Sequence, residues 1–142
     1  MKIKRNNADK WFSQAVREAA DWTCQCCGKQ SIDSDNGMMD NAHCHSRSTR
    51  LTRWHPLNTV CLCRACHMRQ TNDPFEHTSF MREYFGEDVD NMRTLGRSLQ
   101  KVTKKDELLI VKHYKSEVQR IRELRMNGVQ GKIEVEIPKE LL

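Results

Sequence analysis

Hydrophobic side chains recur at helical spacing near the start of the chain. In the stretch NADKWFSQAVREAADW the apolar positions fall three or four residues apart, so one face of a helix would carry them. Asn7 or Asp9 is available to cap the first turn through a side-chain oxygen. The pattern therefore predicts a helix over residues 7–22. The apolar residues on its buried face are Trp11, Phe12, Ala15, Val16, Ala19 and Ala20.

Regular spacing is lost over residues 23–72 and returns after Asp73. Glycine, proline and the sequence SDNG interrupt the middle stretch, which is typical of turns between short strands. We therefore expect short strands there rather than long helices. Beyond Asp73, aromatic and methionine positions predict a helix that ends near Gly86, followed by a short helix over about residues 89–95.

The clearest helical pattern belongs to the stretch TKKDELLIVKHYKSEVQRIRELR. Thr103 and Asp106 have the spacing of a capping box, in which each side chain accepts from the backbone N–H of the other residue. The tail over residues 129–142 either adds a short strand at 132–137 or forms a loose terminus. The apolar residues that follow at three- or four-residue steps along the helix are Ile110, Tyr114, Val118, Ile121 and Leu124.

These patterns predict one α+β domain, because 142 residues suit one hydrophobic core rather than several. Within residues 1–142 a helix at 7–22 precedes a compact core at 23–72, a helical extension at 73–128 and a tail at 129–142. No apolar run approaches the roughly 18 to 20 residues that span a bilayer, and the first residues lack the apolar stretch of a signal peptide. We therefore expect a cytoplasmic protein without membrane contact, in which the seven cysteines are metal ligands before disulfides.

Positive charge is concentrated in one segment. The whole chain has 24 Lys and Arg against 19 Asp and Glu, and this net charge of +5 is weak evidence for a polyanionic partner. Residues 43–71, however, contain five arginines and no Asp, Glu or Lys, which creates a local positive field suited to phosphates. Arg47, Arg50 and Arg53 alternate with Ser and Thr, which also donate to phosphate. We expect these three arginines to contact DNA, with a solvated loop as the alternative.

Two pairs of cysteines have the spacing of zinc knuckles. The C-x-x-C motif occurs in Cys24 with Cys27 and in Cys63 with Cys66. Four thiolates around a tetrahedral Zn²⁺ leave no open coordination position, which marks a structural site. Cys26 stands inside the first motif and Cys61 two residues before the second, so a register that uses either of them stays open. Cys44 is a further candidate ligand, although its position favours a small residue in a strand.

The order of these motifs resembles that of the HNH endonucleases, whose ββα-metal fold is supported by a pair of zinc knuckles. The resemblance rests on Cys-x-x-Cys-Gly, an Ala-His on a strand, HPLNTVCLC and Cys-x-x-Cys-His, in that order. Within this superfamily the chain is most similar to the NinG, or Rap, recombination endonucleases of lambdoid phages, which share a D-x-x-H motif and a long basic helix. The likeness covers roughly residues 22–126.

The resemblance implies roles for four side chains. His43 would act as the general base, a task that suits a neutral imidazole with a pKa of about 6.5. Asn58 would hold the turn between the strands through side-chain hydrogen bonds. His67, on the helix after the second cysteine pair, would bind a catalytic Mg²⁺ or Mn²⁺ ion. Asp40, three positions before His43, is the second expected ligand of that ion.

The chain departs from the HNH pattern immediately before the expected general base. HNH enzymes usually carry a metal-binding Asp or His at this position, where the chain has Ala42. His45 shares the strand face of His43 by the period of two, so it could supply the missing ligand or contact the scissile phosphate. NinG proteins commonly have Asn where His67 stands. Trp54 is expected either to stack on a displaced base or to cover the zinc site.

Three classes of function are compatible with these features. The leading expectation is a metal-dependent DNA endonuclease that selects branched or junction DNA and, if of phage origin, works in the bacterial host cell. The second is a catalytically inactive, zinc-containing DNA-binding module. The third is an interaction protein whose long helix dimerises, although the basic outer face of that helix argues against a coiled-coil seam. A homodimer could also accompany nuclease activity, since cutting two strands of a junction needs two active sites.

Overall fold

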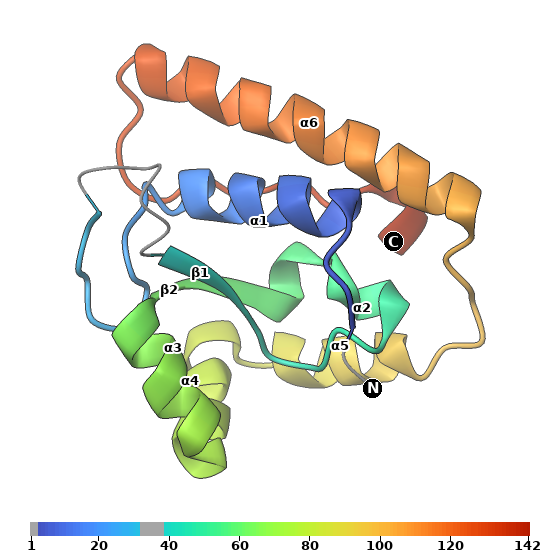
Figure 1. The fold of residues 1–142 in the computed structure, drawn as a ribbon, viewed down its shortest axis with the longest axis horizontal. Helices are drawn as coiled ribbons and strands as arrows, with labels where there is room; N and C mark the ends of the chain where they lie inside the picture. Colours follow the sequence, from blue (N-terminus) through green and yellow to red (C-terminus); the bar gives the residue numbers. More distant parts are fainter. Residues whose placement is uncertain (1–2, 32–38) are drawn as a thin grey trace.

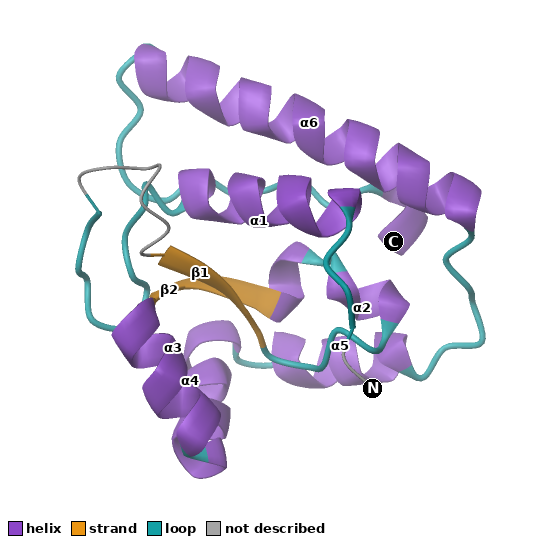
Figure 2. Ribbon diagram, in the orientation of Figure 1, coloured by secondary structure: helices purple, strands orange, loops and turns teal. Residues whose placement is uncertain are grey.

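The computed structural model describes residues 3–31 and 39–142, which form an α+β fold with helices around a two-stranded antiparallel sheet (Figures 1 and 2). The predicted SDNG turn lies outside the described residues. Within these residues, no helix has both the length and the apolar character needed to cross a membrane. The elements in chain order are α1 (Asn7–Ala19), β1 (Met39–His43), α2 (Arg50–Arg53), a 3-10 helix (Pro56–Asn58), β2 (Thr59–Cys63), α3 (Arg64–Asn72), α4 (Pro74–Phe85), α5 (Asp88–Gly96), α6 (Lys104–Met126) and a second 3-10 helix (Lys139–Leu141).

Helix α1 begins at Asn7 as predicted, but it ends sooner than its apolar pattern predicts and is capped by Asn6 in place of Asn7 or Asp9. The side chain of Asn6 caps it by accepting from the Asp9 N–H at 3.0 Å, while Asp9 Oδ2 accepts from the Asn6 N–H at 2.9 Å. The helix ends at Ala19 because Asp21 and Trp22 adopt φ values of 56° and 52°. These left-handed conformations cannot continue a right-handed helix, so the chain reverses here.

The two strands pair antiparallel, with Met39 opposite Cys63 and His43 opposite Thr59. All five residues of β2 are buried. An isolated two-stranded hairpin is marginally stable, and here α1 and α3 both pack against the strands. Helix α6 lies along the outer side of α1 (Figure 1). Because β2 runs directly into α3, the sheet and this helix form a continuous strand–strand–helix unit.

The later helices agree closely with the sequence pattern. Gly86 follows the last residue of α4 with a φ of 59°, a conformation that glycine adopts without a steric penalty. Helix α6 begins after Thr103, whose hydroxyl accepts from the Asp106 N–H at 3.1 Å, while the Asp106 carboxylate accepts from the Thr103 N–H at 2.9 Å. The predicted capping box is therefore confirmed. The buried apolar residues of α6 are Ile110, Tyr114, Val118 and Ile121.

The tail is neither a strand nor a loose terminus. Residues 132–137 form no strand, but the Ile133 N–H donates to the carbonyl of Ala19 at 2.8 Å. The Glu136 N–H donates to the carboxylate of Glu117 on α6 at 2.9 Å. The tail therefore packs as an extended segment against the end of α1 and the middle of α6.

Asp9 joins α1 to the segment around α2 through a buried ion pair. Arg53 donates from Nε to Asp9 Oδ1 at 3.0 Å and from Nη2 to Asp9 Oδ2 at 2.5 Å. These two side chains are only 7 % and 8 % exposed. The indole N–H of Trp54 also donates to Asp9 Oδ1, at 3.0 Å. Burial alone would raise the pKa of Asp9, but the hydrogen bonds from Arg53 and the Asn6 backbone outweigh burial and lower that pKa.

This ion pair shows that two expectations from the sequence were wrong. Arg53 is buried and paired with Asp9, so it is not available to contact DNA. Trp54 is fully buried in the core, so it cannot stack on a displaced base. Trp54 also does not cover the cysteines. It is bonded to Asp9 at the start of α1, whereas Cys24 follows the other end of that helix. The acidic partner stands 44 residues before Arg53, outside the acid-free segment.

Replacing Asp9 with Asn should lower the free energy of unfolding by about 3 kcal/mol, because Arg53 would remain as a buried, unpaired charge. Urea unfolding followed by circular dichroism measures this change. Asp90→Asn is the matched control, since it removes a two-hydrogen-bond pair with Arg82 that is exposed and should leave the midpoint nearly unchanged. Equal midpoints for the two variants would contradict a central role for Asp9.

Candidate active site and metal centre

Four cysteine sulfurs meet where the turn after α1 approaches the junction of β2 and α3. The Sγ atoms of Cys24, Cys27, Cys63 and Cys66 all lie within 4.8 Å of one another. The N–H groups of Cys27 and Cys66 donate to the sulfurs of Cys24 and Cys63, each at 3.5 Å. Gly28 permits the first of these turns, because its φ of +80° would strain a residue with a side chain. The predicted grouping of the two motifs is thereby confirmed.

This cluster could bind a metal ion such as zinc. The sulfurs of Cys27 and Cys63 are 3.8 Å apart, and four thiolates at about 2.3 Å from a tetrahedral zinc ion would be separated by about 3.8 Å. Burial raises the pKa of the Cys24 thiol, but backbone hydrogen bonds outweigh burial and bring that pKa to about 7. Burial and the neighbouring sulfurs raise the pKa of the Cys66 thiol instead, so the hydrogen bonds favour a thiolate at Cys24 alone, and a bound cation would have to stabilise the others. Because four thiolates would fill the coordination shell, the ion would be structural.

The other three cysteines lie outside the cluster. The sulfur of Cys26 is 3.6 Å from Nη2 of Arg69. Cys61 is buried in β2, where burial raises the pKa of its thiol to about 12 and disfavours the thiolate. Cys44 lies one residue beyond the end of β1, so it is not the strand residue that the sequence suggested. Neither alternative register of the motifs is therefore adopted in the structure.

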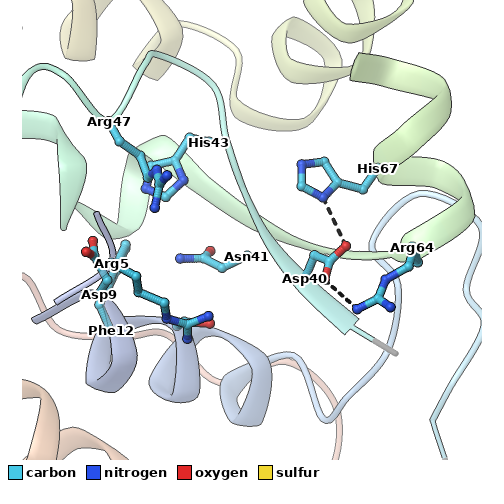
Figure 3. A pocket seen from close by; sticks show the side chains of 10 residues that line it. Arg5, Asp9, Phe12, Asp40, Asn41, His43, Arg47, Arg64 and His67 are labelled. Carbon is cyan, nitrogen blue, oxygen red and sulfur yellow. Dashed lines mark hydrogen bonds and ion pairs between the residues drawn. The ribbon is translucent and has the colours of Figure 1, made fainter. Parts of the chain in front are cut away.

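A pocket of about 520 Å³ opens between β1, α3 and the N-terminal part of α1 (Figure 3). The three residues predicted as general base and metal ligands line it: Asp40 and His43 from β1, and His67 from α3. Figure 3 shows His43 on one side of the pocket, with Asp40 and His67 facing each other on the other side. The remaining lining residues are Arg5, Asp9, Phe12, Ser13, Asn41, Arg47 and Arg64.

One nitrogen of the His43 ring is held by the backbone. Nε2 lies 2.8 Å from the carbonyl oxygen of Arg53, and because a carbonyl only accepts, Nε2 carries the proton and Nδ1 is an acceptor. Phe12 packs against the ring at a centroid distance of 6.4 Å. Burial lowers the pKa of His43 to about 4, and the hydrogen bond to the Arg53 carbonyl offsets burial only in part. The imidazole is therefore neutral near pH 7, as a general base must be.

Asp40 and His67 form a pair across the pocket from His43. Asp40 Oδ2 is 3.0 Å from His67 Nδ1, and Asp40 Oδ1 is 3.7 Å from Nη2 of Arg64. Carboxylate oxygens and imidazole nitrogens both bind divalent cations, and Mg²⁺ usually takes few protein ligands, with water and substrate phosphate completing its shell. Asp40 and His67 therefore fit the two protein ligands of such an ion.

Ala42 offers no metal ligand, and the register of the strands explains why Asp40 faces α3. Alternation along β1 places Asp40 and Ala42 on the same side of the strand, and Ala42 is buried. Asp40 pairs with Leu62, one residue before Cys63, where the chain turns into α3. The carboxylate therefore lies near the first turns of the helix that carries His67.

Asn58 is fully buried and makes three side-chain hydrogen bonds. Its Nδ2 donates to the carbonyls of Thr52 at 2.9 Å and His45 at 3.2 Å, and its Oδ1 accepts from the His45 N–H at 2.9 Å. The backbone carbonyl of Asn58 also accepts from the Cys44 N–H at 2.7 Å. Asn58 thus connects the start of β2 to the loop after β1, and it does not line the pocket.

Two residues that were predicted to contact phosphate or metal, His45 and Arg50, contact other parts of the protein instead. Because β1 ends at His43, strand alternation does not reach His45, whose Nε2 lies 2.8 Å from a carbonyl of α5. Arg50 forms an ion pair with Glu107 of α6 at 2.6 Å and does not line the pocket. Of the three arginines predicted to contact DNA, only Arg47 is a lining residue.

The sequence argument missed three lining residues. Arg64 stands three positions before His67, and residues with this spacing share a helix face, so the motif could have revealed it. Arg5 precedes α1 in the basic stretch KIKRNN, and local charge was the only signal for it. Asn41 Oδ1 is buried without a hydrogen-bond partner beside the pocket.

The geometry combines a neutral imidazole, a carboxylate–imidazole pair and several guanidinium groups in one pocket, with a cysteine cluster at the start of α3. Comparison of the chain with protein-family models, curated proteins and solved structures finds no match. The chemistry available in the pocket therefore has to be argued from these side chains and from the motifs of the sequence.

Cys63→Ser should release the bound metal and unfold the hairpin, because three thiolates and a hydroxyl make a poor tetrahedral zinc site. Metal analysis of the purified protein and circular dichroism measure the two effects. Cys44→Ser is the matched control, since Cys44 lies outside the cluster, and it should keep both metal and fold. Equal metal content in the two variants would contradict the assignment of the cluster.

The His43 ring should stay neutral as the pH falls to about 5 and take up a proton only near pH 4. The unfolded chain binds that proton near the ordinary pKa of about 6.5, so between these values it holds more protons than the folded chain. The contribution of His43 to the free energy of unfolding is therefore complete above pH 6.5 and is lost as the pH falls toward 4.

A nuclear magnetic resonance titration of the zinc-loaded protein, without Mg²⁺ or Mn²⁺, measures this pKa directly. The His43 signals are identified by their absence from the spectrum of His43→Ala. A titration midpoint near 6.5 would show that the ring is solvated and would contradict the half-buried, neutral state.

Proposed function

We propose that the protein is a metal-dependent DNA endonuclease of the HNH type that hydrolyses phosphodiester bonds with His43 as general base. One observation carries the proposal: a neutral imidazole faces an Asp40–His67 pair across a pocket that is also lined by guanidinium groups. Hydrolysis of a phosphodiester needs a base for water, a cation for the developing charge and contacts that hold the phosphate. The pocket offers a candidate for each.

His43 would take the proton from the attacking water. Its Nδ1 is the available acceptor, because Nε2–H donates to the carbonyl of Arg53. As the water oxygen bonds to phosphorus, its proton moves to Nδ1, the bond to the 3′ oxygen breaks and that oxygen takes a proton from solvent. The Arg53 carbonyl keeps the ring oriented and favours the imidazolium that forms. Asn58 would act as a positioning residue, through the loop that it holds after β1.

Asp40 and His67 would hold the catalytic Mg²⁺ or Mn²⁺. When bound, such an ion supplies positive charge that stabilises the phosphorane and the leaving oxygen. Asp40 and His67 approach from different elements, β1 and α3, and Arg64 keeps the carboxylate on the α3 side of the pocket. The cysteine cluster would support this arrangement from the other end of β2, where α3 begins.

Arginine side chains are suited to hold the phosphates beside the cut. A guanidinium donates two parallel hydrogen bonds to a phosphate and keeps its charge at any physiological pH. Arg47 and Arg5 both line the pocket, and Arg47 donates to the carbonyl of Ile3 at 3.4 Å. This bond connects the loop after β1 to the N-terminal segment that carries Arg5. The two arginines can therefore act on one DNA backbone.

The likeness to phage recombination endonucleases supports further features of the proposal. These are branched or junction DNA as the substrate, a bacterial host cell as the place of action and two copies of the chain at one junction. A second candidate function is a zinc-containing DNA-binding module without catalysis. Ala42 favours this alternative, because the position before His43 contributes no metal ligand.

His43→Ala should lower the rate of DNA cleavage by about 10²- to 10⁴-fold while leaving the fold and DNA binding intact. The measurement uses zinc-loaded protein with labelled linear duplex, flap, D-loop and Holliday-junction DNA, in Mg²⁺, in Mn²⁺ and in neither. His113→Ala is the matched control, since His113 lies on α6 with its ring bonded to the tail, and it should cut at the normal rate.

Asp40→Asn and His67→Ala in the same assay should raise the Mg²⁺ or Mn²⁺ concentration needed for half-maximal cleavage. Binding of DNA without cutting under every metal condition would favour the inactive DNA-binding module. Cutting that needs no added ion, or that persists in His43→Ala, would overturn the roles given to the pocket.

A further inference from the structure

A second pocket, of about 190 Å³, lies on the other side of the loop that follows β1. We call it the α5 pocket. It is lined by His45, Thr49 and Thr52 from the loop and α2, and by Met92, Arg93, Gly96 and Arg97 from and after α5. None of these residues lines the candidate active site. The donors that it offers to a ligand are two guanidinium groups and the hydroxyl of Thr49, because the His45 ring and the Thr52 hydroxyl already face backbone carbonyls as donors.

The walls of the α5 pocket are held in place by close packing. Gly96 lets α5 approach α2, because a Cβ at this position would lie only 3.0 Å from the Thr49 methyl group. His45 is fixed by the contact of its Nε2 with the carbonyl of Val89, and Thr52 is fully buried. The pocket is therefore a built feature of the α2–α5 contact.

The charge of the α5 pocket is positive. Arg93 and Arg97 are both exposed, and in the described part of the chain neither forms an ion pair with a carboxylate. The nearest carboxylate along α5 belongs to Asp90, three residues before Arg93. Arg82 already holds Asp90 through two hydrogen bonds of 3.2 Å each. Two guanidinium groups beside the hydroxyl of Thr49 match the oxygens of a phosphate.

The loop after β1 connects the α5 pocket to the candidate active site. His43 and Arg47 line the active-site pocket, while His45 lines the α5 pocket, and two residues of extended chain span at most about 7 Å. Ser46 and Ser48, on the same loop, are exposed. Hydroxyls therefore lie between two basic pockets, as a path for a phosphate backbone requires.

We propose that the α5 pocket binds a backbone phosphate of the DNA strand that crosses the loop after β1, at a distance from the phosphate that is cut. This inference rests on the proposed function for the identity of the polymer. The pocket would fix the direction in which the strand enters the active site, since it lies on one side of His43 only. A free phosphate ion offers the same oxygens, so the test has to separate the two sources.

The test uses the His43→Ala protein, in which binding is measured without cutting, and a labelled single-stranded oligonucleotide. Arg93→Gln combined with Arg97→Gln should weaken binding about tenfold. The slope of log K against log salt should fall by about 0.7, as expected for the loss of one phosphate contact. Lys104→Gln combined with Lys112→Gln is the matched control, because it removes equal charge from exposed positions of α6 that line neither pocket.

Equal binding by the two double variants would overturn the inference. A second arm adds inorganic phosphate and follows the side-chain resonances of Arg93 and Arg97. If inorganic phosphate shifts these resonances and the oligonucleotide does not, the pocket is a site for free phosphate and the DNA assignment is overturned. A chain that binds DNA through Arg93 and Arg97 yet never cuts it would support this inference while overturning the nuclease function.

Discussion

The buried carboxylate of Asp9 is the interaction on which the arrangement of the pocket depends. It accepts hydrogen bonds from Arg53, from Trp54 and from the backbone of Asn6, so α1 and the segment around α2 are joined at one point. The carbonyl of Arg53 in turn faces Nε2 of His43. A charge on the first helix therefore decides which nitrogen of the candidate base is free, although Asp9 itself is engaged entirely with the protein.

The hairpin that carries the pocket is secured at both ends. At one end Met39 pairs with Cys63, a member of the cysteine cluster, and at the other end the side chain of Asn58 bonds the loop after β1. A two-stranded sheet has little stability alone, so positions on β1 such as His43 would otherwise move with the fraying of the strands. Rigid ends place side chains from β1 and α3 at fixed separations, which is what a site with ligands from two elements needs.

Local signals in the sequence predicted α1, α4, α5 and α6, the capping box of α6 and the grouping of the cysteines, because spacing along the chain decides each of these. The motif order also drew attention to Asp40, His43 and His67, which the structure brings to one pocket. What failed depended on partners distant in sequence. An arginine in a basic loop looks free until a carboxylate 44 residues away is seen beside it, as with Arg53. The prediction for His45 failed for a local reason. Strand β1 ends at His43, two residues too early for strand alternation to apply to His45.

The packing of α1 against α6 also constrains the order in which the chain can fold. The side chains of Glu18 and Arg122 pair at 2.8 Å across 104 positions of sequence, and the tail beyond α6 bonds to the end of α1. Domains generally fold from the N-terminus during synthesis, but here the first helix meets its largest partner last. The cysteine-supported hairpin can form earlier, from contacts nearer in sequence. A chain still on the ribosome would thus bring its four clustered cysteines together before α6 locks α1 in place, so the carbonyl that orients His43 is fixed only after α6 has emerged.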